Sequence, residues 1–259
     1  MEPIYITGAG VVSAIGIGKT ETLASLQAER SGIREIRYLK STHTDLPVGE
    51  VQLSNDELAE RLGLGDSQRY TRTALIGKLA LQEALQEALL LGQPLDEVHF
   101  ISGTTVGGMD RRELIHAQEP GCGREIAEIA THNCAGCTEM IAEGLGDFAS
   151  MATLSTACSS ATNAIITGAN MLRCGLADIV VVGGAECLSL FHLNGFNALM
   201  ILDHQPCRPF DKDRAGLNLG EGAAYLVMET AASAQQRGLK PKFVLSGYAN
   251  TCDAFHQTA

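Results

Sequence analysis

Short apolar runs, each four or five residues long, constrain the fold of this chain more than any other feature. Most are apolar at consecutive positions, as expected of strands that are covered on both faces. Five stand out, with a sixth near the end: Ile4–Thr7, Val98–Ser102, Thr153–Thr156, Ile179–Val182, Ala224–Met228 and Phe243–Ser246. Helical patterns separate several of them, at Thr71–Leu91 and Ser159–Arg173. The alternation predicts a layered α/β domain with a mainly parallel, five-stranded sheet.

Two polar, glycine-punctuated stretches interrupt this alternation, at about residues 30–68 and 104–150. We interpret them as insertions in a unit that spans residues 1–241. The run Phe243–Ser246 begins a new strand, and the sequence ends without a following helix. Residues 242–259 are therefore expected to be the start of a truncated second unit.

The composition narrows the class of function. The 259 residues include 30 acidic and 19 basic side chains, a net charge of −11, whereas a nucleic-acid binder needs a basic face. The apolar runs are far shorter than the ~20 residues of a membrane helix, and the N-terminus lacks the features of a signal peptide. We therefore predict a soluble, cytoplasmic protein without nucleic-acid or membrane partners, whose eight cysteines are reduced.

The sharpest chemical signal is the segment Leu154–Ala161, in which an apolar run passes directly into a predicted helix. The helix is apolar over most of its circumference, so it is expected to be buried. Cys158 falls at its N-terminus, where free N–H groups and the helix dipole favour a thiolate. The pattern predicts a nucleophile at Cys158; the alternative is that Cys158 is an inert structural thiol like most buried cysteines.

Two segments resemble nucleotide-binding motifs, but each lacks one required glycine. Thr7–Ser13 resembles G-x-G-x-x-G, but its third glycine is replaced by Ser13. Gly18-Lys19-Thr20 resembles the end of a phosphate-binding loop, and the glycine required five positions earlier is again Ser13. A Gly-rich turn from strand to helix is the favoured interpretation, and a nucleotide-dependent oxidoreductase is the weaker alternative.

Three other groups of residues are candidates for a metal site, a docking surface and catalytic groups. Cys134 and Cys137, with His132 and Cys122 nearby, have one C-x₂-C spacing that zinc uses, but they lack a second pair, so reduced loop cysteines are favoured. Arg69, Arg72 and Lys78 form a basic island without acids, which indicates a solvated helix face or a docking surface. The charged residues of the late loop are interpreted as an ion-pair network rather than as catalytic groups: Asp211, Asp213, Arg214 and Glu221.

The strip Ser155–Ser160 resembles the active-site strip of the β-ketoacyl-acyl-carrier-protein synthases. Other segments resemble marks of that family in the same order along the whole chain: Ile6–Ser13, Gly107-Gly108-Met109, Gly183–Glu186, Arg208–Gly216, Gly220–Ala223 and Asp253–Thr258. The resemblance implies the N-terminal half of a duplicated, thiolase-like α/β/α/β/α sandwich, with the Cys158 helix buried between layers.

The resemblance also implies a function. Cys158 would accept an acyl group from a carrier-protein thioester, and a decarboxylated malonyl-carrier thioester would then condense with it, as in fatty acid or polyketide-like synthesis. Val106, Gly107, Gly108 and Phe196 match positions that line the acyl pocket. The basic island matches a region that docks the acyl carrier protein. No metal, nucleotide or flavin is implied.

The family's second half brings two catalytic histidines and a lysine, and no histidine of this chain has the matching context. We therefore expect the 259-residue chain to be inactive in condensation when expressed alone. A homodimer, or a heterodimer with a related chain, is expected through Thr153–Thr156. The alternative function is a non-catalytic, chain-length-setting partner subunit, against which the presence of Cys158 argues.

Overall fold

A computed structural model of the chain describes residues 2–118, 133–241 and 243–251, with the side chains of 114–118 excepted. Its strands are β1 (Ile4–Ser13), β2 (Gly16–Ile17), β3 (Val98–Gly103), β4 (Ser150–Leu154), β5 (Ile179–Glu186), β6 (Gly222–Thr230) and β7 (Phe243–Leu245). Its helices are α1 (Lys19–Gln27), α2 (Asn55–Arg61), α3 (Arg72–Glu87), α4 (Met109–Gln118), α6 (Cys134–Ala142), α7 (Ser160–Arg173), α8 (Leu190–Ala198) and α9 (Ala231–Gln236), with a 3₁₀ turn at Ser67–Arg69.

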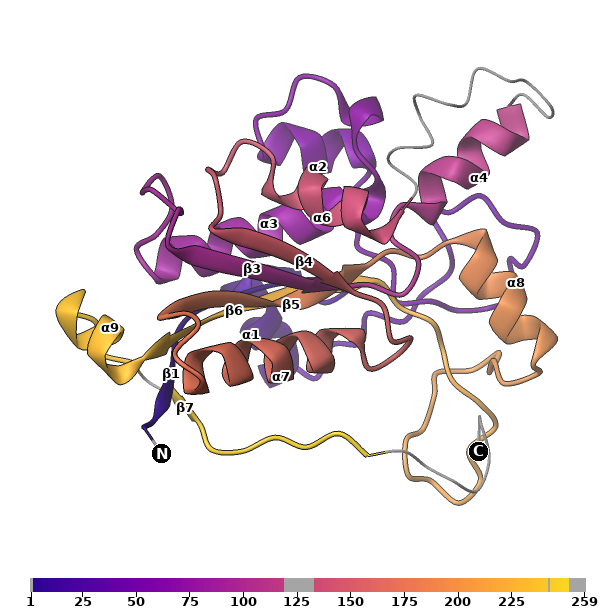
Figure 1. Cartoon of the computed structure of the whole chain (residues 1–259). Helices are drawn as coiled ribbons and strands as arrows, with labels where there is room; N and C mark the ends of the chain where they lie inside the picture. The colour runs from indigo at the N-terminus through magenta and orange to yellow at the C-terminus, as the bar shows by residue number, and fades with distance from the viewer. Residues whose placement is uncertain (1, 119–132, 242, 252–259) are drawn as a thin grey trace.

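One sheet lies between two helical layers (Figure 1). Its strands follow the order β2-β1-β6-β5-β3-β4, and β7 pairs with β1 beside β2. The helices α3 and α6 pack on one face and α7 on the other. The predicted α/β class is confirmed.

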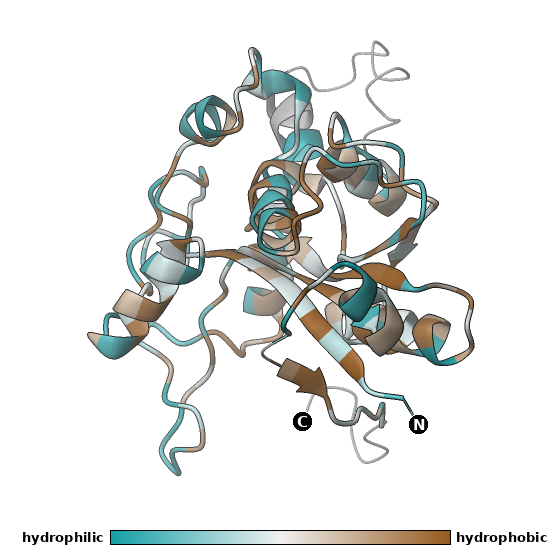
Figure 2. Ribbon diagram, turned by 90° about the vertical axis from the view of Figure 1, so that its left-hand side faces the viewer, coloured by the Kyte–Doolittle hydropathy of each residue, from teal (hydrophilic) through white to brown (hydrophobic). Residues whose placement is uncertain are grey.

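Neighbouring residues of the central strands point into two different cores, which explains why the apolar runs are continuous. On β5, Val181 belongs to the α3 core, whereas Val180 and Val182 belong to the α7 core. Phe100 and Ile101 of β3 divide in the same way. Figure 2 shows the hydrophobic residues that mark these strands. Burial on both faces thus selects apolar side chains at every position.

Within the described residues the sheet is mixed and has seven strands, so the prediction of a mainly parallel, five-stranded sheet was wrong. Of the strand pairs described there, β3–β4 and β3–β5 are parallel, whereas β6 runs antiparallel to both β5 and β1. The reason is the connection between β5 and β6. After β5 the chain forms α8 and a long loop. It then re-enters the sheet from the same end at which β5 left it, so β6 runs in the opposite direction.

Helix α7 is half-buried, whereas the sequence predicted a fully buried helix. Ala164, Gly168 and Leu172 pack toward the sheet, but Thr167 and Asn170 on the other side are exposed. In the described part of the chain only one sheet is available to cover this helix, and a sheet covers one face. No helix of the described residues is long and apolar enough to cross a membrane.

Candidate active site

Three parallel strands end at the same edge of the sheet, and each is followed by a segment that builds the candidate site. The loop Thr104–Gly108 follows β3, the turn Ser155–Ser159 follows β4, and Cys187–Ser189 follows β5. Figure 1 shows these ends together with the N-terminus of α7 and with α8. Sites of α/β proteins form at the carboxyl ends of parallel strands, where the connecting loops diverge.

Cys158 lies in the turn between β4 and α7, two residues before the first helical residue, Ser160. Its side chain is exposed, and the preceding residue, Ala157, has a φ of 53°. Non-glycine residues rarely adopt this left-handed conformation, which costs about 1–2 kcal/mol. The sequence-predicted placement of Cys158 at a helix N-terminus is confirmed, and the turn presents its thiol to solvent.

The backbone bonds of this turn leave the Cys158 amide free. The N–H groups of Ser159 and Ser160 donate to the carbonyl oxygens of Thr156 and Ala157. Among the described residues, none accepts a hydrogen bond from the Cys158 N–H. A free donor next to the thiol suits the negative charge that develops when a thiolate adds to a carbonyl group.

Two glycines allow the start of α7 to lie directly on the sheet. A Cβ atom at Gly103 would lie 2.5 Å from the backbone nitrogen of Ala161, and one at Gly184 would lie 2.5 Å from the carbonyl oxygen of Gly103. Any side chain at either position would push α7, and with it the Cys158 turn, away from strands β3 and β5. The small residues at these strand ends therefore fix the height of the turn above the sheet.

Glu186, at the end of β5, organises the loop after β3. Its carboxylate accepts hydrogen bonds from the Thr105 N–H and, at 3.2 Å, from the Thr104 hydroxyl. Ser155, three residues before Cys158, donates to the Thr105 carbonyl at 2.9 Å. Burial raises the pKa of Glu186, and its Oε1 atom has no hydrogen-bond partner among the described residues. The sequence predicted no role for Glu186 beyond its place in a segment that resembles the family. Its position, an acidic residue at the end of an apolar strand, was the signal that could have identified it.

The predicted acyl-pocket residues occupy the same end of the sheet. Gly107 has a φ of 63°, and its carbonyl accepts a bond from the Thr73 hydroxyl at 3.1 Å. Gly108 is buried and Val106 is half-buried. Phe196 is half-buried on α8, which lies at this end in Figure 1. Their role as the lining of an acyl pocket stays a prediction.

Two of the three residues of the basic island are buried, so the structure does not present the three as one surface. Lys78 is 3% exposed, and its ammonium donates to the carbonyls of Ile141 and Glu143. Arg72 is 7% exposed. Only Arg69 reaches solvent, where it pairs with Glu143 at 3.3 Å. Sequence periodicity could not show that α3 is enclosed on these sides by α6 and by the loop before it.

The predicted ion-pair network of the late loop is also wrong. Glu221 is buried and pairs with Arg72, with Oε1 2.6 Å from Nη2. Arg214 donates instead to the carbonyl oxygen of Asp211, and the Asp213 N–H donates to the Asp211 carboxylate. The late loop is thus held by hydrogen bonds to its own backbone, while Glu221 belongs to the core.

The remaining cysteines differ from Cys158 in burial or in position. Cys134 and Cys137 lie on α6 rather than in a loop, and burial raises the pKa of Cys137 to about 12. Cys187 is buried, whereas Cys174 is exposed at the C-terminal end of α7. Cys122 and His132 lie outside the described residues. The described residues contain no cluster of His, Cys, Asp or Glu that could hold a metal ion.

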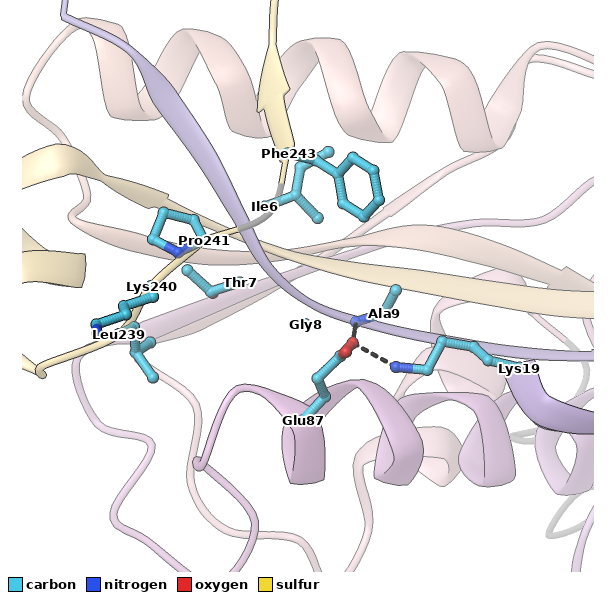
Figure 3. Close-up of a pocket in the computed structure, with 10 residues that line it drawn as sticks. All are labelled: Ile6, Thr7, Gly8, Ala9, Lys19, Glu87, Leu239, Lys240, Pro241 and Phe243. Carbon is cyan, nitrogen blue, oxygen red and sulfur yellow. Dashed lines mark hydrogen bonds and ion pairs between the residues drawn. The ribbon is translucent and has the colours of Figure 1, made fainter.

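The glycines of the Thr7–Ser13 motif, Gly8 and Gly10, lie inside β1 rather than in a turn. A Cβ atom at Gly10 would lie 1.9 Å from the Ala80 carbonyl oxygen, so the glycine serves the close packing of β1 on α3. The Ala9 N–H donates to Glu87 at 2.8 Å, and the Lys19 ammonium pairs with the same carboxylate. Figure 3 shows this group in a cavity of about 510 Å³. The Glu87 carboxylate thus takes up the Ala9 N–H and the Lys19 ammonium, the groups that a bound phosphate would need as donors.

Comparisons with known proteins place this geometry in a family. Residues 1–234 match the family described as beta-ketoacyl synthase, N-terminal domain. The chain therefore belongs to the β-ketoacyl synthase family. Segment 253–258, which also resembles the family, lies outside the described residues.

The similar proteins are condensing enzymes by name. The chain is 30% identical to the 3-oxoacyl-[acyl-carrier-protein] synthase 2 of Synechocystis sp., over 99% of the chain and 64% of that protein. It is 28% identical to the Staphylococcus aureus (strain N315) protein of the same name, over 99% of the chain and again 64% of the relative. The chain thus spans a little less than two thirds of these relatives.

Solved structures confirm the thiolase-like ketosynthase fold. The ishigamide ketosynthase/chain length factor superposes with a TM-score of 0.87 at 29% identity, covering 100% of this chain and 66% of that one. A ketosynthase in complex with its chain length factor from Xenorhabdus doucetiae gives a TM-score of 0.70 at 25% identity, covering 88% of this chain and 58% of that one.

Proposed function

We propose that this chain carries the nucleophile of a β-ketoacyl-acyl-carrier-protein synthase. The observation that carries the proposal is the exposed Cys158 thiol, held on a strained turn at the N-terminus of α7 beside a free backbone N–H. Family membership and the names of the similar proteins support the same chemistry.

In the proposed first step, the Cys158 thiolate adds to the carbonyl carbon of an acyl thioester on a carrier protein. The Cys158 N–H stabilises the resulting oxyanion. The carrier thiolate then leaves and takes up a proton, and the acyl group stays on Cys158 as a new thioester. Covalent catalysis in this form divides one difficult condensation into two easier steps.

In the proposed second step, a malonyl-carrier thioester loses carbon dioxide and its enolate attacks the acyl carbon. The carbon–carbon bond forms as the Cys158 thiolate is released. The enolate oxygen needs fixed donors, and removing one such donor typically costs about 10²–10³ in rate. The resemblance implies that the family supplies these donors from histidines of its second half.

Acylation is the direct test. The protein is incubated with an acyl-carrier thioester, and its peptides are mapped by mass spectrometry. The acyl mass is expected on the peptide that contains Cys158, and Cys158→Ala should abolish it. Cys174→Ala, which removes the exposed thiol at the other end of α7, is the matched control and should leave acylation unchanged. An acyl group found only on other cysteines would contradict the proposal.

The neighbouring structures that contain chain length factors support a second candidate, a non-catalytic partner subunit. The same experiment separates the two functions, because a partner subunit would bind the carrier without a covalent adduct at Cys158. The proposed partners are an acyl carrier protein and a second copy or a related synthase chain. Of the predicted docking residues only Arg69 remains available to a carrier.

A further inference from the structure

The turn that carries Cys158 is held by more than its own backbone. The Ser159 hydroxyl donates to the Thr156 carbonyl at 2.8 Å, and the Ser160 hydroxyl donates to the Ala157 carbonyl at 2.7 Å. The left-handed Ala157 lies between these bonds. A strained residue persists only where its surroundings fix it, so the groups that brace this turn also fix the direction of the thiol.

Asn163 adds a brace from one turn further along α7. Its side-chain NH₂ group donates to the Thr156 hydroxyl at 2.8 Å and to the Ser159 hydroxyl at 3.2 Å. These two residues flank Ala157 and Cys158, so one amide group joins both ends of the strained turn. Asn163 does not need to touch the thiol to hold it in place.

The other end of the same amide contacts a distant part of the chain. The Asn250 NH₂ group donates to the Asn163 side-chain oxygen at 2.9 Å. The segment that includes Asn250 follows β7 and runs along α7 (Figure 1). It is anchored a second time where the Tyr248 hydroxyl donates to Asn170, seven residues after Asn163 on the same helix.

We propose that Asn163 is a positioning residue that orients Cys158 and couples the turn to the segment after β7 through Asn250. This inference rests on the proposed function, because it concerns the same thiol. Its consequence is that the placement of residues 247–251 along α7 sets how Cys158 is presented. Displacing that segment loosens the turn, and docking it tightens the turn.

The test measures the rate at which iodoacetamide alkylates Cys158 over a range of pH, followed by peptide mapping. In the wild-type protein Cys158 is expected to react first. Asn163→Leu, which keeps the size and loses the bonds to Thr156, Ser159 and Asn250, should slow Cys158 at least about tenfold across the pH range. Asn163→His, which keeps an N–H donor and a ring acceptor, should restore most of the rate. Asn250→Ala should give an intermediate loss.

The matched control is Asn197→Leu, the same change at an exposed asparagine of α8 that belongs to neither the turn nor the segment after β7, and its rate should stay within twofold of the wild type. Asn170→Leu, which removes the second anchor of that segment, should slow Cys158 in the same direction as Asn250→Ala. A wild-type rate and pH profile in Asn163→Leu would overturn the positioning role and leave the acylation proposal standing. Failure of wild-type Cys158 to react ahead of Cys174 would instead count against the proposed function. If Asn163→Leu does not fold, Asn163→Ala takes its place and the same comparison decides.

Discussion

Asp110, at the start of α4, is a half-buried residue whose carboxyl group is enclosed and has an incomplete set of partners. Its Oδ2 atom accepts the Arg72 N–H at 2.7 Å, but Oδ1 has no hydrogen-bond partner among the described residues. Burial raises the pKa of Asp110 to about 6, against 3.8 for the free side chain. The folded state therefore binds this proton more tightly than the unfolded state does. Ionised Asp110 reduces stability above pH 6, and the loss is recovered as the pH falls toward 4.

Replacing Asp110 with Asn removes this charge and keeps an acceptor for the Arg72 N–H. We expect Asp110→Asn to raise the free energy of unfolding at pH 7.5 by on the order of 1–3 kcal/mol. The gain should shrink as the pH falls and vanish below about pH 3, where the wild-type carboxyl is protonated in both states. Denaturant unfolding at three pH values measures it. The exposed Asp147→Asn is the control, and an equal gain at every pH would contradict the assignment.

Single residues were the easiest and the hardest features to predict from the sequence. Cys158 was found because the passage from strand to helix is local in sequence. The burial of Arg72 was missed because its partner, Glu221, lies 149 residues away. The roles of Glu186 and Asn163 depend on contacts with other loops, and those contacts cannot be inferred from sequence spacing.

At the scale of elements, the buried Arg72–Glu221 pair joins α3 to the segments before β6 and after β5. The Arg72 guanidinium also donates to the carbonyls of Leu53 and Val51, at 3.0 and 2.9 Å. Glu221 accepts the Leu188 N–H at 3.0 Å. Both charges are thus fully hydrogen-bonded, which is the condition under which a buried pair is tolerated.

We expect Arg72→Met to lower the free energy of unfolding by about 3–5 kcal/mol, because it leaves Glu221 buried without a counter-charge. Adding Glu221→Leu to that variant should recover part of the loss. Arg69→Ala, which removes only the exposed pair with Glu143, should cost less than about 1 kcal/mol. Urea unfolding compares the three. Equal losses for Arg72→Met and Arg69→Ala would show that the buried pair is not a stabilising link.

The helices were predicted more accurately than the sheet. Helix α7 begins one residue after the predicted start and ends at the predicted Arg173. Strand β1, in contrast, continues to Ser13 through glycines that were interpreted as a turn. Periodicity and caps define a helix locally, whereas the glycines of β1 are explained only by the helix packed against them.

At the scale of the whole molecule, β4 is the last strand of the sheet and its outer edge is unpaired within the described chain. Ser150, Met151 and Ala152 are exposed there. An apolar edge strand invites pairing with another chain. This geometry supports the predicted association through the β4 region, which the sequence placed at Thr153–Thr156.

Sedimentation should show a dimer at micromolar concentration. Met151→Lys places a charge on the edge strand, which natural sheets use to prevent such pairing, and should shift the protein toward monomer. Met200→Lys, at a methionine that is 88% exposed on the loop after α8, is the control and should leave the dimer intact. A wild-type monomer, or equal behaviour of the two variants, would exclude pairing through β4.

The pairing of β1 with β6 determines when this domain can fold during synthesis. Ile4 pairs with Thr230 and Ser13 with Gly222, so β1 leaves the ribosome and then waits for a partner strand that is made more than 200 residues later. At about 5–20 residues per second, that delay is on the order of ten to forty seconds. Throughout it, β1 lacks the strand that joins it to β5 and to the rest of the sheet. A nascent chain of this kind depends on being shielded until its last long strand has emerged.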